Sequence, residues 1–271
     1  MQIGEAIAVA AVKQDPKEDC WFCKEEPKSE KKKTDLKANP DTSAAEVPDA
    51  VPENKEDNNS STLGSNLIGA GQKEPKWKVK NLLKPGKTSA VVPAAHHCIP
   101  GEASMAKATT LHDFMREGGP HDYESDIGYD INDAKNGVWL PGNYAVREGN
   151  PDFNSKTWTL QTPKFQMDYV KLAMDKASGK MFHDAHRTYN GKVKGTLVSI
   201  ANKLKKPKKG KCPICEKPEQ KKRPPYGLVN RLHGVSGSHR TMLEAPSKKA
   251  VLGGYYTSSK GRDVFLKKNG M

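Results

Sequence analysis

Apolar residues recur with a helical period in one clear stretch of the chain. Between residues 186 and 204 they follow one another at spacings of four, three and four, which places them on one face of a helix. We therefore predict a helix over about 186–204, although an Asn-Gly pair and Gly195 weaken it. The positions that carry the prediction are Val193, Leu197, Ile200 and Leu204.

Two shorter helices and two strands are predicted upstream of this helix. Residues 103–117 have a partial apolar face before a Gly-Gly-Pro stop, and residues 165–177 end near Gly179. Residues 91–95 are apolar around a proline, and residues 138–140 follow an Asn-Gly turn signal, so both favour extended strands. Helices and strands in this mixture predict an α+β fold.

Two stretches lack such a period and divide the chain into regions. Residues 25–75 are rich in Lys, Glu, Pro, Ser, Asn and Asp and contain no aromatic residue, which is typical of a disordered linker. Residues 205–271 begin with a Lys/Pro-rich tract, and we expect a small or poorly ordered basic tail there. The predicted regions are therefore 1–24, 25–75, 76–204 and 205–271.

Charge changes the picture of what the chain binds. The 271 residues carry a net charge of +13, and the mean hydropathy is −0.80, so part of the chain cannot enter a core. A basic balance favours an anionic partner, most commonly nucleic acid, although a merely solubilising surface would look the same. Basic tracts neutralise phosphates without reading sequence, and the alternative for them is a solvated linker. The tracts hold Lys203, Lys205, Lys206, Lys208, Lys209, Lys211, Lys221, Lys222 and Arg223.

No segment approaches the roughly 20 consecutive apolar residues of a membrane-spanning helix. The apolar run near the start of the chain lacks the basic flank and the cleavage pattern of a signal peptide. We therefore expect no membrane partner, and any export would use another route.

The candidate chemistry centres on histidine. Residues 95–100 read A-H-H-C-I-P, and residues 183–189 read H-D-A-H-R-T-Y. Histidine can serve as a base near neutral pH and as a ligand of a divalent metal. A spacing of three places His183 and His186 on one face of a helical turn, whereas the neighbours His96 and His97 need a bulge or a strand end to serve one site. The pattern predicts a one-metal site with two ligands from a helix and one from an extended segment.

These histidine segments, with G-Y-D-I-N at 128–132 and N-G-V-W-L-P at 136–141 between them, resemble the AHH-type branch of the HNH (ββα-metal) endonucleases. The resemblance covers roughly residues 90–204 and implies a ββα-metal core with flanking helices. The expected fold adds to this core the disordered linker predicted from composition and a basic tail that zinc would fasten through the cysteine pairs described below. The resemblance also implies that His97 is the general base, that Asn136 orients it, and that Tyr189 packs or positions phosphate. The implied metal ligands are His96, His183 and His186.

One departure concerns the last histidine pair, which is usually more widely spaced in this branch. One of His183 and His186 would then be a supporting group or a substrate contact, with water or a carboxylate such as Asp184 as the third ligand.

The function implied by the resemblance is a metal-dependent, largely sequence-nonspecific endonuclease that hydrolyses DNA with Mg²⁺, Mn²⁺, Zn²⁺ or Ni²⁺. The branch is known mainly as a module of bacterial polymorphic toxins, including type VI secretion effectors. The implied partners are DNA, a cognate immunity protein and a secretion-apparatus component, and the implied place of action is the cytoplasm of a target cell. The alternatives are a non-catalytic, zinc-dependent DNA-binding protein and an HNH nuclease that is not a toxin.

Four of the five cysteines form two C-x2-C pairs, Cys20 with Cys23 and Cys212 with Cys215. An odd total without a signal peptide argues against a secreted disulfide framework. Four thiolates predict a tetrahedral structural zinc that ties the N-terminal segment to the basic C-terminal region. A rival ligand set joins the second pair to His233 and His239. Unligated, reduced cysteines and a redox-active pair would produce the same spacing.

The remaining cysteine and histidines have plainer interpretations. Cys98 is expected to pack as a small apolar residue beside the histidine site. A single histidine is usually a surface residue or a satisfied polar one, and we expect this of His112, His121, His233 and His239.

Overall fold

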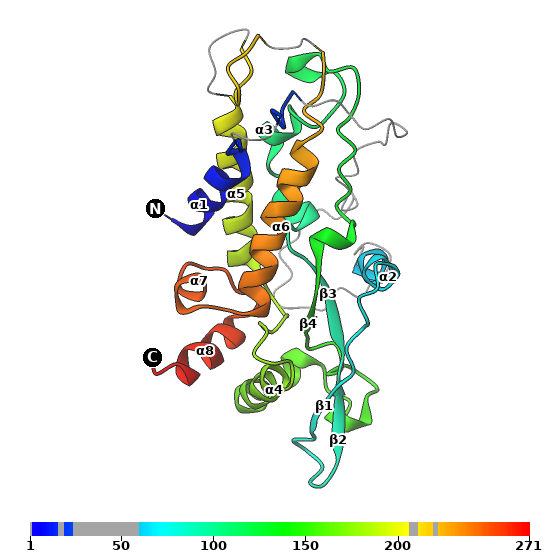
Figure 1. Cartoon of the computed structure of the whole chain (residues 1–271). Coiled ribbons are helices and arrows are strands. Elements are labelled where there is room, and N and C mark those ends of the chain that lie inside the picture. The colour runs from blue at the N-terminus through cyan, green and yellow to red at the C-terminus, as the bar shows by residue number, and fades with distance from the viewer. Residues whose placement is uncertain (1, 16–18, 24–59, 206–210, 219–221) are drawn as a thin grey trace. The chain divides into compact units, whose positions relative to one another are not determined.

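The computed structural model describes residues 2–15, 19–23, 60–205, 211–218 and 222–271 (Figure 1). The contacts divide the chain into two compact units, each built from three separate segments. Unit 1 takes residues 1–38, 99–131 and 190–238, and unit 2 takes residues 39–98, 132–189 and 239–271. Helices with two small antiparallel sheets make up the described residues, as the α+β prediction requires.

Unit 2 contains both sheets. Strand β1 (Trp77–Lys80) pairs with β2 (Thr88–Val91), and β3 (Pro93–His97) pairs with β4 (Gly137–Pro141). Both pairs are antiparallel, and the second register runs from Pro93 opposite Pro141 to His97 opposite Gly137. The strands predicted around residues 91–95 and 138–140 are confirmed. The register of the second pair decides where the double histidine lies.

Helix α2 (Ser60–Gly69) lies beside β3 and β4, within the stretch whose composition predicts a disordered linker (Figure 1). Leu63 and Leu67 are fully buried against Trp139. A β-carbon at Gly137 would lie 2.8 Å from Leu63 Cδ1 and 2.9 Å from Leu67 Cδ2, so the helix approaches β4 where the strand has no side chain. The linker prediction is wrong here because two leucines four residues apart suffice to bury one helical face. Residues 25–59 of that predicted linker lie outside the described residues.

Helix α4 (Pro163–Lys176) confirms the helix predicted over 165–177. The Thr162 hydroxyl accepts a hydrogen bond from the Phe165 amide, and Pro163 occupies the first turn, where its missing N–H costs nothing. The helix packs against β1 and against α8 (Ser259–Lys268) (Figure 1). Its inner face joins an aromatic cluster of Phe153, Trp158, Phe165, Tyr169 and Phe182.

Unit 1 holds α1 (Ile3–Val12) and most of α5 (Arg187–Leu204). The four apolar positions that predict this long helix are all fully or almost fully buried, so the periodic pattern is confirmed. The helix predicted over 103–117 is largely wrong. A π-helical turn (Gly101–Met105) and a short α3 (Thr109–His112) replace it, because Ala108 leaves helical geometry at φ −92° and ψ 49°.

The C-terminal region is more ordered than its composition predicts. It contains α6 (Leu228–Glu244), α7 (Lys248–Leu252) and α8, and serine side chains cap the last two. Leu228, Leu232 and Val235 form a buried stripe on α6 with helical spacing, which Gly234 and Gly237 obscure in the sequence. Short 3-10 turns occur at Gly119–His121, Ala134–Asn136, Pro151–Phe153 and Trp158–Leu160. Among these described segments, no helix has the length and apolar character to cross a membrane.

Candidate metal centre

Strand β3 directs the side chains of the neighbouring residues His96 and His97 to opposite faces. They take consecutive positions in a ladder that runs without a bulge to His97, so their side chains leave opposite faces of the strand. His96 is 3% exposed, and His97 is half-buried. Beyond the last pair, the Cys98 amide donates to the Asn136 carbonyl at 2.7 Å, which fixes the end of the strand.

His183 and His186 lie in the segment before α5 and not on a helix, so the predicted helical placement is wrong. The His183 amide donates to the Pro141 carbonyl at 2.8 Å, and His183 forms a parallel bridge with Gly142. The chain then bends at Asp184, whose carboxylate accepts a hydrogen bond from the Ala185 amide. Main-chain pairing to the end of β4 therefore sets the position of His183, and the bend brings His186 back beside it.

Three imidazole rings meet at one place in unit 2. The ring centroids lie 5.0 Å apart for His96 and His183, 5.1 Å for His96 and His186, and 5.0 Å for His183 and His186. One nitrogen of each ring lies within 4.8 Å of the others. The group contains three histidines and no carboxylate, so the structure brings both members of the last pair together with His96 and leaves Asp184 out of the group.

The protonation of these rings suits a metal. Burial, followed by the neighbouring imidazoles, lowers the pKa of His183 to about 3 and holds the pKa of His96 well below its ordinary value. Both rings are therefore neutral at neutral pH, which is the form that binds a cation. His96 Nε2 is buried and has no hydrogen-bond partner among the described residues. A divalent ion shared by the three rings would satisfy this nitrogen, so the residues present fit a metal.

His183 also contacts a tyrosine through one of its ring nitrogens. The Tyr144 hydroxyl lies 3.5 Å from His183 Nδ1, and the two rings are stacked with centroids 5.9 Å apart. A contact at Nδ1 leaves Nε2 available to the cluster.

His97 contacts Asn132, a residue of the G-Y-D-I-N segment to which the sequence motifs give no role. Its Nε2 lies 3.0 Å from Asn132 Oδ1, and the Asn132 carbonyl accepts a hydrogen bond of 2.8 Å from Asn66 on α2. If Oδ1 accepts from Nε2–H, Nδ1 carries the lone pair of His97. Asn136 is fully buried, and its main-chain carbonyl anchors the strand end next to His97. The orienting role expected of Asn136 stays a prediction, whereas the side chain of Asn132 contacts the ring directly.

Tyr189 packs against the histidine cluster. It is 0% exposed, and its hydroxyl donates to the Cys98 carbonyl at 2.6 Å. Its ring centroid lies 5.3 Å from that of His96 and 5.9 Å from that of His239. Full burial makes Tyr189 a packing residue, so of the two roles that the resemblance implies for it, direct phosphate positioning is wrong.

His239 and Cys98 belong to the same buried layer. His239 is 0% exposed and stacks on Tyr255, so the surface interpretation is wrong for this histidine. Cys98 is also fully buried, and burial raises the pKa of its thiol to about 12, which confirms the expected apolar packing. A single sequence gives no signal for His239, because it lies far along the chain from the other histidines of the site.

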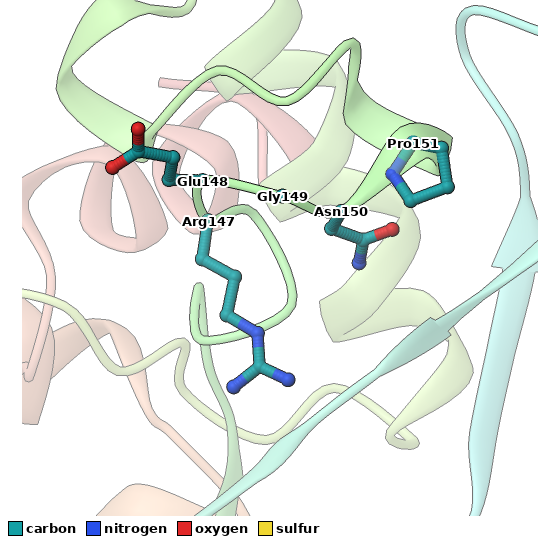
Figure 2. Close-up of a pocket in the computed structure, with 5 residues that line it drawn as sticks. All are labelled: Arg147, Glu148, Gly149, Asn150 and Pro151. Carbon is teal, nitrogen blue, oxygen red and sulfur yellow. The ribbon is translucent and has the colours of Figure 1, made fainter.

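A surface hollow also occurs in unit 2, on one loop after β4. Arg147, Glu148, Gly149, Asn150 and Pro151 line it (Figure 2). The Arg147 and Glu148 side chains point in different directions, and the Asn150 side chain is bonded to the Ala145 carbonyl and the Asp152 amide. These lining groups do not converge on a point, so the hollow is a weaker candidate for chemistry than the histidines.

The four paired cysteines also come together, in unit 1. Each offers a sulfur within 4.8 Å of the other three. Among the described residues, the groups able to hold a metal are this one and the histidine cluster, and neither includes His233 or His239. The rival finger-like set is therefore not what the structure assembles.

Comparisons with known proteins agree with the histidine site. A family model matches residues 78–212, and it describes a nuclease family of the HNH/ENDO VII superfamily with a conserved AHH motif. In this chain the motif is Ala95, His96 and His97 on β3. No curated protein and no solved structure matches the chain. Through residues 78–212, which include all three clustered histidines, the chain belongs to the AHH family of nucleases in the HNH/ENDO VII superfamily.

Proposed function

We propose that this nuclease is a metal-dependent endonuclease that hydrolyses DNA with little sequence preference. The observation that carries the proposal is that the rings of His96, His183 and His186 lie together. His96 and His183 are buried and neutral. A fourth histidine, His97, follows His96 on β3. We assign β3, β4 and the start of α5 to the ββα-metal core.

Each side chain then has a defined task. The three clustered histidines would hold a divalent ion, which supplies charge stabilisation for the phosphate and the leaving oxygen. His97 accepts a proton from the attacking water at Nδ1, and Asn132 keeps that nitrogen unprotonated by accepting from Nε2–H. Tyr189 holds the Cys98 carbonyl and so limits movement of the strand end that bears His97.

DNA as the substrate is supported by charge. The chain carries a net charge of +13, and a basic surface binds the phosphate backbone irrespective of sequence. Such binding fits an enzyme that cuts without sequence preference. RNA shares the phosphate, so a parallel assay with single-stranded RNA tests the preference for DNA.

The test is plasmid degradation with added Mg²⁺, Mn²⁺, Zn²⁺ or Ni²⁺. We expect wild-type protein to cut, and His97→Ala to lose at least about 100-fold in rate, as is typical for removal of a proton-transfer group. His183→Ala should also lose activity, because it removes one of the side chains that would hold the divalent ion. His121→Ala, a histidine outside the cluster, is the matched control. If the wild type retards DNA in a gel but never cuts it, the non-catalytic DNA-binding alternative replaces this proposal.

We further propose that the nuclease is an antibacterial effector that acts in the cytoplasm of a target cell. Its partners would be a cognate immunity protein and a component of the secretion apparatus. The support is the likeness of the A-H-H segment and its companions to toxin modules of this branch. Expression in a bacterium should be toxic and should be relieved by the product of the neighbouring gene. An active but harmless enzyme would instead be an HNH nuclease outside the toxin class.

A further inference from the structure

The four cysteines outside the histidine site sit on two short knuckles in unit 1. In the first, the Cys23 amide donates to the Cys20 carbonyl at 3.1 Å. In the second, the Glu216 amide donates to the Cys212 carbonyl at 3.1 Å, and the Ile214 amide donates to Cys212 Sγ at 3.4 Å. Each knuckle therefore turns both of its sulfurs to one side, and an N–H directed at sulfur favours a thiolate.

The sulfur separations are those of a metal-bound set. Cys20 Sγ lies 3.8 Å from Cys212 Sγ, and Cys23 Sγ lies 3.9 Å from Cys215 Sγ. A disulfide needs about 2.0 Å. A tetrahedron with zinc–sulfur bonds of about 2.3 Å has edges of about 3.8 Å. The pairs that cross between the knuckles thus match the edges of a zinc tetrathiolate.

We propose that Cys20, Cys23, Cys212 and Cys215 bind one structural zinc ion that fastens the N-terminal knuckle to the C-terminal knuckle within unit 1. Zinc suits the site because thiolates prefer a soft cation and a closed four-ligand shell leaves no position for chemistry. The ion is separate from the histidine-bound metal and does not depend on the nuclease proposal.

The zinc would stabilise the packing of Trp21, which lies between Cys20 and Cys23 in the sequence. Trp21 is 5% exposed, and the Arg231 guanidinium on α6 lies 5.4 Å from the centroid of its ring. A β-carbon at Gly227 would clash with the Trp21 carbonyl, so the first knuckle rests directly on the turn that precedes α6. Glu5 on α1 adds a 2.6 Å ion pair to Lys203 on α5. The metal thereby holds residues 19–23 against α6 and the turn before it, far along the chain.

The experiment measures zinc in the full chain by elemental analysis after dialysis against a chelator at neutral pH. We expect one zinc per chain in the wild type, one in His183→Ala and one in the matched cysteine control Cys98→Ala, but none in Cys212→Ser. Cobalt(II) should reconstitute a site whose spectrum shows thiolate-to-cobalt charge transfer.

Two results would overturn the proposal. One is zinc that disappears with His183→Ala and persists in Cys212→Ser. The other is a folded wild-type protein in which the paired thiols react at once with a thiol reagent, or in which they form disulfides or hold iron. If Cys212→Ser fails to fold, titration of the wild type with a mercurial decides the matter, because release of one zinc per four modified thiols is then required. None of these readouts depends on DNA cleavage.

Discussion

Two adjacent histidines in the A-H-H segment have different surroundings because of strand geometry alone. His96 faces the buried cluster, whereas His97 reaches Asn132 on the other side. His97 is the last residue of β3, so the pair lies at a strand end, one of the two arrangements that the sequence pattern allows. The pair can therefore divide between metal binding and proton transfer without a bulge. The contact with Asn132 is the part of this division that can be tested at a single residue.

Asn132→Leu should lower kcat by roughly 10- to 100-fold, the usual loss when a group that orients a site residue is removed. KM for DNA should stay unchanged, because Asn132 is 5% exposed and is not placed to bind substrate. Asn132→Asp still accepts from Nε2–H, so it should keep most of the activity while the acid limb of the pH–rate profile moves to higher pH. Steady-state kinetics across pH measure both effects. Equal losses in the two variants would mean that Asn132 only maintains the fold.

The three clustered histidines could be identified from the sequence because they stand in motifs whose order resembles that of a known family. Asn132 and His239 could not be identified as neighbours of the site. Asn132 is one polar residue in a motif without an assigned role, and His239 resembles a surface histidine in a basic tail. Their importance comes from burial and from contacts made between distant segments, which a single sequence does not encode in any local pattern.

His239 makes stability depend on pH. Burial lowers its pKa to about 4, whereas the unfolded chain has an ordinary histidine pKa of about 6.5. Its contribution to stability is therefore complete above about pH 6.5 and is lost as the pH falls toward 4, because the unfolded state binds the proton first. At pH 5 the loss amounts to about 2 kcal/mol, at about 1.36 kcal/mol per pH unit.

His239→Phe keeps an aromatic ring on Tyr255 and removes the titrating group. The difference in the free energy of unfolding between pH 7 and pH 5, measured by urea denaturation, should be about 2 kcal/mol smaller in this variant than in the wild type. His96 and His183 titrate in both proteins and cancel in the comparison. Identical pH dependence in the two proteins would show that His239 has the same pKa in the native and unfolded states, which would contradict the lowering of its pKa by burial.

Among the secondary-structure elements, those with a long period or a complete motif are predictable from the sequence, and short or interrupted ones are not. Helices α4 and α5 and strands β3 and β4 follow from apolar spacing and turn residues. Helix α2 escapes prediction because its two leucines lie in a polar composition, and α6 because glycines interrupt its stripe. In both, packing against other elements stabilises a helix whose local propensity is modest.

The close packing of α2 against β4 predicts that a larger residue at Gly137 will clash with α2. Gly137→Ala places a β-carbon 2.8 Å from Leu63 and 2.9 Å from Leu67, so we expect a loss of about 1–3 kcal/mol in the free energy of unfolding. Leu63→Ala opens the space, and the double variant should be more stable than the sum of the two single losses predicts. Gly195→Ala is the control, since nothing lies within 4 Å of its β-carbon. Strict additivity would mean that α2 does not rest on Gly137.

The whole molecule combines a compact histidine site with a strong positive charge. Each unit is assembled from three separated segments, so neither can form from a continuous stretch of the chain. The regions predicted from composition cannot anticipate this, because composition reports local character and not which segments pack together. Net charge is different, since it acts over the entire chain and can be read directly.

Charge predicts how DNA binding responds to salt. The logarithm of the binding constant should fall linearly with the logarithm of the salt concentration, with a slope of about 0.9 for each phosphate contacted. Lys206, Lys208 and Lys209 lie outside the described residues, so the expectation for them rests on charge alone. Replacing all three with Gln should reduce the slope by up to about 3.

The matched control replaces three lysines of α4, Lys164, Lys171 and Lys176, which changes the net charge equally. Fluorescence anisotropy with a labelled duplex measures the slopes. If the slope falls by the same amount in the two triple variants, DNA binding depends on the overall charge of the protein and not on the tract. The other outcome is that only the tract variant has a smaller slope, while its cleavage rate at saturating DNA is unchanged. The tract then recruits DNA, and the histidine site alone sets the rate of the chemical step. The reason is that phosphate contacts outside the site add binding energy equally to substrate and transition state.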